Sequence, residues 1–519
     1  MNEMTKRRRG GGRGGNARRA AGSAVAQMPW SQPRVIDAPT CPLDEEGVAK
    51  VDNAAMRILE EIGIDFLHEE ARDHLKAAGA TVEGERVRMG REMVRELVAR
   101  APSEFTLTPR NPERQLTIGG NWQANVNVSS PPSSSNLDRG RRAGTQEDFR
   151  DLVKLSHYFN CIHVLGGYPV EPADIHASIR HLECLRDKLK ISDKVIHTYA
   201  LGVERVEDAI EMVRIAGGLT HEEFDASPRF YTNINSTSPL KHDWPMLDGA
   251  MRLVKRGQMV SVTPFTLSGA MAACTLSGAI AQQTAEALAA IALFQWIAPG
   301  CPVVMGSFTS NVDMKSGAPA FGTPEYMRAT QMSGQMARFY GLPLRASNAN
   351  AAKCPDAQAA WESAFSLWAC QSARVNLIYH AAGWLEGGLC ASYEKFVMDC
   401  ETLQQMAAYN RPVGVTEDDL AVDALAEVDA MPAAQRHFLG ASHTMERYTT
   451  AFYAPFLSDW SNFKAWEEAG ATQTPERANK VWKQILAEFE PAPMDEAVAE
   501  ELDEFVDRRI REGGQPTDF

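Results

Sequence analysis

The chain has 519 residues, of which 44% are hydrophobic and 23% charged, a composition typical of globular proteins. Its formal net charge of −14 argues against general nucleic-acid binding. No window holds the roughly 20 apolar residues that a membrane span needs, so we expect no membrane-spanning segment. The nine cysteines form no CxxC pair and no apolar secretory signal is present, which predicts reduced thiols and a cytoplasmic location.

The first residues differ in charge from the rest. Residues 1–34 carry eight basic side chains and a single acid, Glu3, around the glycine-rich stretch Gly10–Gly15. Such a segment cannot bury enough apolar surface to fold alone, so we predict a disordered basic arm over residues 1–40.

The sequence pattern of residues 41–120 predicts a small α+β segment. Apolar residues recur at helical spacing from Leu43, and a hairpin-like stretch lies at Ala80–Met89. The runs Phe105–Thr108 and Gln115–Ile118 alternate as short strands do.

Residues 121–392 alternate short β-branched or apolar runs with helical patterns. Helix starts are marked by Thr145, which opens a capping-box pattern, and by Thr323 before Pro324. Eight parallel βα units predict a closed (β/α)₈ barrel, a TIM barrel. The eight predicted strands are Gln123–Ser129, Cys161–Gly166, Lys194–Tyr199, Arg229–Asn235, Met259–Phe265, Pro302–Phe308, Pro343–Asn348 and Val375–Ala381.

Residues 393–519 predict a helical extension. It is rich in aromatic residues after Tyr448 and ends in an acidic amphipathic helix at Met494–Arg511. The aromatic residues predict either a docking or dimer surface or packing against the outer barrel helices. We expect the chain to be a homo-oligomer.

Barrel enzymes work at the C-terminal ends of their strands. These ends carry polar and aromatic residues and few acids, and each also has a structural interpretation as a core or loop-holding residue. No paired carboxylates, HExxH, His/Cys cluster or phosphate-binding glycine loop is present, so we expect neither a metal nor a nucleotide site. The strand-end residues include His197, Tyr199, Asn233, Asn235, Thr263, Phe265, Ser307, Phe308, Arg345, Ser347, Asn348, Tyr379, His380, Trp384 and Glu386.

Several long motifs resemble one family. The segments 321–325, 337–345, 352–359, 380–389 and 392–399 are similar to the trimethylamine methyltransferase family, and the resemblance extends from about residue 40. Founding members of that family combine a (β/α)₈ barrel with a corrinoid-dependent reaction and use pyrrolysine to handle trimethylamine. This sequence has no pyrrolysine, so it resembles the branch that includes glycine betaine:corrinoid methyltransferases.

The resemblance implies methyl transfer from a quaternary amine, glycine betaine above all, to the cobalt(I) of a corrinoid, releasing dimethylglycine. No DxHxxG-type cobalamin motif occurs here, so we expect the corrinoid on a partner protein. Alternatives are trimethylamine, carnitine or proline betaine as the methyl donor, and a lyase or aldolase with Lys353 as the nearest candidate lysine. A further alternative is a non-enzymatic protein that binds through its basic arm.

The substrate's chemistry then predicts roles for the strand-end residues. A trimethylammonium group is held by aromatic faces, here Tyr199, Phe265, Phe308 and Trp384. A carboxylate needs a charged clamp, for which we expect Arg345 and His380. If protonated His380 takes part, binding weakens above its pKa. We expect no certain catalytic residue: His380, supported by Asn235 and Ser307, would position the substrate, and Asn348 and Glu386 would make further contacts to it.

Overall fold

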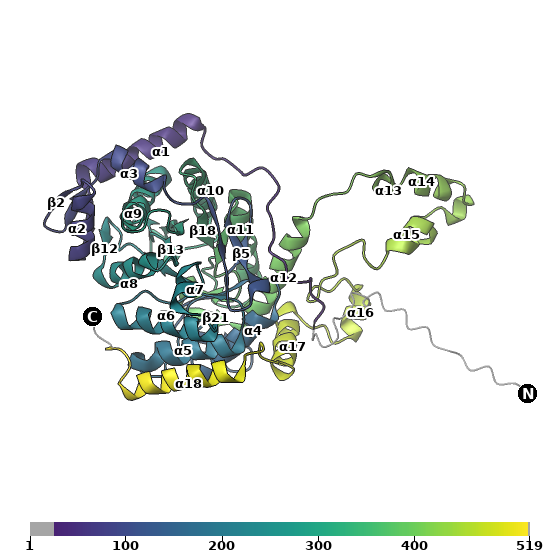
Figure 1. Cartoon of the computed structure of the whole chain (residues 1–519). Coiled ribbons are helices and arrows are strands. Elements are labelled where there is room, and N and C mark those ends of the chain that lie inside the picture. The colour runs from purple at the N-terminus through teal and green to yellow at the C-terminus, as the bar shows by residue number, and fades with distance from the viewer. Residues whose placement is uncertain (1–24, 517–519) are drawn as a thin grey trace, which may run out of the picture.

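The computed structural model describes residues 25–516, and the basic residues before Val25 lie outside the described part. Figure 1 shows a body of strands and surrounding helices, from which the segment between α12 and α16 projects. Its centre is a parallel α/β sheet, as the sequence predicts.

Eight short parallel strands lie in the centre, one inside each predicted run. Six form one sheet in the order β11-β13-β15-β18-β19-β6, and β9 and β10 pair separately. Two isolated parallel bridges, Val126 to Val164 and His197 to Tyr231, connect the pair to the two edges of the larger sheet. The strands are β6 (Ala124–Asn125), β9 (Val164–Leu165), β10 (Val195–Ile196), β11 (Tyr231–Ile234), β13 (Met259–Val262), β15 (Val303–Gly306), β18 (Leu344–Ser347) and β19 (Leu377–Tyr379).

Helices follow the strands and start where the capping signals predict. Thr145 forms a capping box with Asp148, and Thr323 caps a helix whose first residue is Pro324. Among the described residues, no helix is both long and apolar enough to cross a membrane. The helices are α4 (Gln146–Tyr158), α5 (Ala177–Ile191), α6 (Val203–Ala216), α7 (His221–Asp225), α8 (Trp244–Lys255), α9 (Leu276–Ile297), α10 (Pro324–Phe339), α11 (Ala357–Ala373) and α12 (Tyr393–Tyr409).

The N-terminal α+β segment packs against α9 and includes a strand from the central region. β12 (Lys241–His242) pairs in parallel with β1 (Ile64–Phe66), so this segment is tied to the loop after β11. The hairpin of β4 (Glu104–Leu107) and β5 (Leu116–Gly119) packs its apolar residues against the central strands. The other elements are α1 (Glu45–Arg57), a π-helix (Ile58–Ile62), α2 (Glu69–Ala77), β2 (Thr81–Glu83), β3 (Arg86–Arg88), α3 (Arg91–Val98) and a short 3-10 helix (Pro112–Arg114).

The expectation of disorder over residues 1–40 does not hold for residues 25–40. Val35 is buried and its N–H donates to the carbonyl of Asn121, while Trp30 packs edge-on against His163. These apolar contacts and backbone hydrogen bonds offset the entropy of ordering the chain.

Small sheets follow directly after the central strands. β14, β16 and β17 form one, and β20, β21, β7 and β8 form another. They place loops over the C-terminal strand ends. Their bounds are β7 (Ser133–Asn136), β8 (Gly140–Ala143), β14 (Leu267–Ser268), β16 (Ser310–Val312), β17 (Pro319–Ala320), β20 (Trp384–Leu385) and β21 (Cys390–Ser392).

The C-terminal extension is helical, as predicted, but only part of it packs on the body. α17 (Thr474–Ala487) contacts α12 and α4, and α18 (Glu496–Arg511) lies along α5 and α6 (Figure 1). The remaining helices are α13 (Glu417–Leu420), α14 (Val422–Asp429), α15 (Ser442–Arg447), α16 (Phe463–Glu468) and two 3-10 helices (Ala433–Gln435 and Phe438–Gly440).

Candidate functional site

A buried guanidinium lies at the centre of the C-terminal strand ends. Arg345, on β18, is 3% exposed, and its guanidinium carbon is 4.2 Å from the centre of the Tyr379 ring and 5.4 Å from that of Phe308. One terminal N–H donates to the carbonyl of Ser307 at 3.3 Å, and the Nε–H has no hydrogen-bond partner. Burial lowers the pKa of Arg345, and in the described part of the chain no carboxylate lies within 4.0 Å of it.

This arrangement fits a small anion. An ion buried without a counter-charge costs several kcal/mol, and a carboxylate can remove that cost by accepting two parallel hydrogen bonds from guanidinium. Other polar atoms nearby also lack partners, namely Nδ1 of His197, Nδ1 of His380 and Oγ of Ser347. The site therefore offers a cation and several unused polar groups.

The two histidines are neutral. Burial holds the pKa of His380 well below its usual value, and the charge of Arg345 lowers it further. Burial likewise lowers the pKa of His197, with smaller effects from Lys188 and Arg345. The expected protonated form of His380 is therefore disfavoured, because a second cation beside Arg345 would be desolvated and repelled. A neutral imidazole can still donate one hydrogen bond.

Aromatic rings surround the position next to Arg345. Phe308 lies 5.0 Å from Phe265 and 6.2 Å from Trp384 between ring centres, and His380 stacks on Trp384 at 4.9 Å. Phe265 and Phe308 keep part of their surface exposed, whereas Trp384 is buried. Three of the four expected aromatic residues thus come together.

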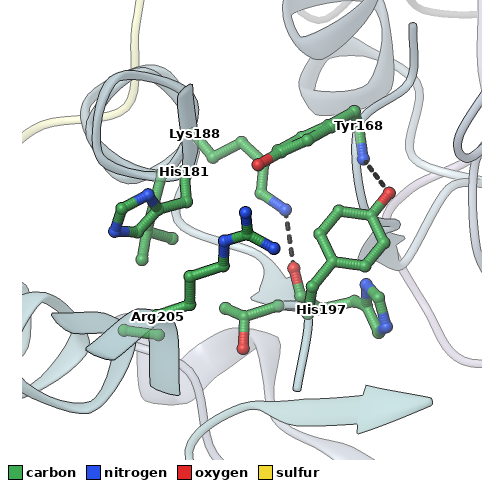
Figure 2. A pocket seen from close by; sticks show the side chains of 9 residues that line it. Tyr168, His181, Lys188, His197 and Arg205 are labelled. Carbon is green, nitrogen blue, oxygen red and sulfur yellow. Dashed lines mark hydrogen bonds between the residues drawn. The ribbon is translucent and has the colours of Figure 1, made fainter. Parts of the chain in front are cut away.

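Tyr199, the fourth, lies elsewhere. Its ring contacts Tyr168 and His197, and its hydroxyl accepts from the Tyr168 N–H at 3.0 Å and pairs with the Ser130 hydroxyl at 2.6 Å. It lines a cavity of about 30 Å³ between α5, α6 and the strand ends (Figure 2). That volume suits one or two water molecules rather than a trimethylammonium group.

A buried lysine forms another wall of this cavity. Lys188 donates to the carbonyls of Gly166 and Gly167 at 2.8 and 3.1 Å. It also donates to the carbonyl of His197 at 2.7 Å (Figure 2). Burial lowers its pKa to about 7. The lysine thus holds the ends of β9 and β10 together.

The expected supporting residues are mostly engaged with protein atoms. Asn235 donates to the Thr263 carbonyl at 2.7 Å, and the Ser307 hydroxyl lies 2.8 Å from that of Ser333. Asn348 donates to the Ala381 carbonyl at 3.2 Å, and Glu386 pairs with Arg141 at 2.7 Å. These contacts order the loops around Arg345.

Tyr231 and Phe321 were missed by the sequence analysis. Tyr231 starts β11 and lies in the same buried ring cluster as His197 and Tyr379, and Phe321 stacks on Phe308 at 5.6 Å. The alternation of Tyr231 with Asn233 and Asn235 was the available signal. No group of three or more His, Cys, Asp or Glu residues that could hold a metal ion occurs within residues 25–516.

Comparisons with known proteins identify the family. The model of the trimethylamine methyltransferase family matches residues 8–514. The glycine betaine methyltransferase of Desulfitobacterium hafniense (strain Y51) is 37% identical over 474 residues, covering 91% of this chain and 98% of its own. The proline betaine:corrinoid methyltransferase of Eubacterium limosum is 28% identical, covering 70% and 76%.

Among solved structures, the monomethylamine methyltransferase of Methanosarcina barkeri aligns with a TM-score of 0.47 and 11% identity. The alignment covers 90% of this chain and 95% of that one. From the family match and the 37% identity, this chain belongs to the trimethylamine methyltransferase family.

Proposed function

We propose that this chain is a methyltransferase that moves a methyl group from glycine betaine to the cobalt(I) of a corrinoid carried by a separate protein, releasing dimethylglycine. The observation that carries the proposal is the buried Arg345, which has no carboxylate partner among the described residues and lies beside partly exposed phenyl rings. A betaine offers the carboxylate and the alkylated cation that these two features suit.

We also propose that the eight parallel strands form one closed (β/α)₈ barrel. The support is the pair of parallel bridges at Val126 and His197, which connect both edges of the six-stranded sheet to the β9–β10 pair. In a closed ring the C-terminal strand ends converge on one mouth, which brings Arg345, Phe308 and His380 together.

The substrate would lie with its carboxylate on Arg345 and its trimethylammonium group against Phe265, Phe308 and Trp384. Each aromatic face contributes roughly 0.5–2 kcal/mol toward holding the cation. Because Phe265 and Phe308 are the partly exposed members, the methyl groups would point outward, to where a corrinoid protein approaches.

The chemistry needs no proton at the nitrogen. The carbon–nitrogen bond breaks with its electron pair on nitrogen, so a quaternary ammonium leaves as a neutral tertiary amine. The corrinoid, a co-substrate here, supplies from cobalt(I) the electron pair that takes the methyl group. The protein's contribution is to hold the reacting carbon in line, and the neutral His380 and His197 fit a reaction without a general acid.

The corrinoid protein is the proposed macromolecular partner at the mouth, and we place the enzyme in the cytoplasm. All nine cysteines, from Cys41 to Cys400, are free thiols, which fits a reducing compartment.

The test is methylation of free cob(I)alamin by the purified chain. We expect glycine betaine to yield methylcobalamin and equimolar dimethylglycine, detected by absorbance and by mass spectrometry. Proline betaine, carnitine, choline and trimethylamine form the comparison panel. Turnover of trimethylamine or choline in preference to both betaines would contradict a site built around a carboxylate.

A further inference from the structure

The outer face of α11 is apolar and uncovered. Its exposed large side chains are Trp361, Phe365 and Trp368, at 53%, 50% and 45% exposure, with the small residues Ala360 and Ala364 between them. The one charged residue of this helix, Glu362, is buried. Solvent-facing helix surfaces ordinarily carry charged or polar residues, so a face without any marks an interaction surface.

The neighbouring helix extends this face. Tyr409, the last residue of α12, is 55% exposed and its ring lies 5.3 Å from that of Trp368. Its hydroxyl pairs with Asp37 at 3.2 Å. We call the surface of Trp361, Phe365, Trp368 and Tyr409 the α11 face.

A second apolar surface lies on the segment that projects from the body. Residues 411–452, here called the arm, leave α12 and reach outward through α13, α14 and α15 (Figure 1). Ala424, Val428 and Ala441 are its only buried residues. Exposed large apolar side chains on it are Val413, Val415, Leu420, Val422, Leu425, Phe438, Leu439, Met445, Tyr448 and Phe452.

The arm cannot stabilise itself. Its longest helix, α14, has eight residues, well short of what holds an isolated helix in water. The arm's side-chain hydrogen bonds, such as Ser442 to Glu427 and His443 to Asp418, join arm residues to one another. Ordering more than forty residues with so little burial is unfavourable unless another surface covers them.

The arm does not cover the α11 face of its own chain. Figure 1 shows α13 to α15 extending away from the body, and the ring exposures above confirm that the face is open. The arm leaves α12 at Tyr409, beside Asp37, whose carbonyl accepts from Arg374 just before β19, at the N-terminal ends of the strands. That end is opposite Arg345, where a corrinoid protein must arrive.

We propose that two copies of this chain form a two-fold dimer in which the arm of each copy packs on the α11 face of the other. Each copy then supplies both surfaces, as a closed symmetric interface requires. Complete burial removes roughly 150–250 Å² of an aromatic side chain from water, and each aromatic side chain of the α11 face still has about half of that to lose. Covering the α11 face and the arm's apolar residues therefore reaches the roughly 800 Å² per partner of a stable interface.

The first experiment measures mass in solution by sedimentation and light scattering. We expect the full chain to be a dimer, and two variants to be monomers that keep the wild-type circular dichroism. One, W361E/F365E, alters the α11 face, and the other, L439E/F452E, alters the arm. The matched control is Ile62→Glu, which changes a 48% exposed apolar residue on neither surface and should remain dimeric.

The second experiment tests the exchange by mixing the two monomeric variants. The L439E/F452E copy keeps an intact α11 face and the W361E/F365E copy keeps an intact arm, so one arm-to-face contact remains. We expect a heterodimer that dissociates more readily than the wild-type dimer. Sedimentation detects it when one of the two copies carries a small fluorescent label.

Three results would overturn the proposal. They are a monomeric wild-type chain at micromolar concentration, a dimer that persists in both variants, and mixed variants that stay apart. If the variants instead keep their dimer and lose affinity for the corrinoid protein, the two surfaces dock that partner.

Discussion

At the residue scale, the decisive feature is that Arg345 is charged, buried and without a carboxylate partner in the described part of the chain. Truncating one partner of a buried charge pair costs about 2–5 kcal/mol, and here the substrate carboxylate would be the partner of Arg345. We predict that Arg345→Met lowers kcat/KM for glycine betaine by about 30-fold or more. Steady-state formation of dimethylglycine measures this.

The same substitution should behave differently without substrate. Removing an unpaired buried charge removes its desolvation cost, so ligand-free Arg345→Met should unfold at the wild-type temperature or higher. Wild type should be stabilised by added glycine betaine and the variant should not. Glycine betaine should stabilise Arg345→Lys to an intermediate extent, because lysine keeps the charge but lacks the planar fork of the guanidinium. A large loss of unfolding temperature in Arg345→Met would instead assign the arginine a structural role.

A second prediction at this scale concerns pH. The pKa of His380 is lowered well below its ordinary value by burial and by Arg345, so the neutral ring is favoured at neutral and alkaline pH. The betaine carboxyl is ionised throughout that range. We therefore expect the Kd for glycine betaine to change by less than about twofold between pH 6 and 9, as calorimetric titration would show. Binding that weakens steadily above pH 7 would indicate a protonated His380.

At the scale of elements, α12 positions the turn that carries Trp384. Asp399 accepts from the Gly383 N–H at 2.9 Å and pairs with Lys395 at 2.6 Å, and both side chains of the pair are almost fully buried. Asp399→Asn leaves Lys395 charged and unpaired, which costs about 3–5 kcal/mol. We predict that much loss of unfolding free energy in urea, together with a raised KM for glycine betaine.

The control for this prediction is a pair of the same helical spacing on the surface. Lys50 and Glu46 lie 2.7 Å apart with 74% of each side chain exposed. Solvent screening makes such a pair worth about 0–1 kcal/mol, so Glu46→Gln should leave stability and KM nearly unchanged. Equal losses in the two variants would show that burial does not decide the effect.

Sequence patterns located the elements better than the contacts between them. Each of the eight central strands fell inside its predicted run because apolar and β-branched residues act locally, and the caps at Thr145 and Thr323 likewise marked where helices start. Their positions at strand ends were enough to select Arg345, Phe308 and His380 as candidate site residues. By contrast, Ser307 bonds to Ser333 on α10 and Asp399 accepts from the distant Gly383 N–H, and no local pattern reveals these two contacts.

At the scale of the whole molecule, residues 25–40 act as part of the body. Val25 and Val35 are buried, the Thr40 N–H donates to the Ser372 carbonyl, and Arg374 donates to the carbonyl of Asp37. Fully burying one valine side chain is worth about 1.5–3 kcal/mol. Removal of this segment would also expose the apolar cluster that β4 and β5 form with the central strands.

Two truncations therefore separate the basic residues from the segment that packs. Deleting residues 2–24 should leave the unfolding temperature and the methyl-transfer rate at wild-type values, because Arg345 and the central strands all lie within residues 25–516 and are retained. Deleting residues 2–40 should lower the unfolding temperature by several degrees, as a thermal melt would record. If the shorter deletion abolishes nucleic-acid binding seen in the full chain while methyl transfer persists, the basic residues add a binding function to an intact enzyme. If it abolishes methyl transfer itself, the reaction depends on residues outside the site around Arg345.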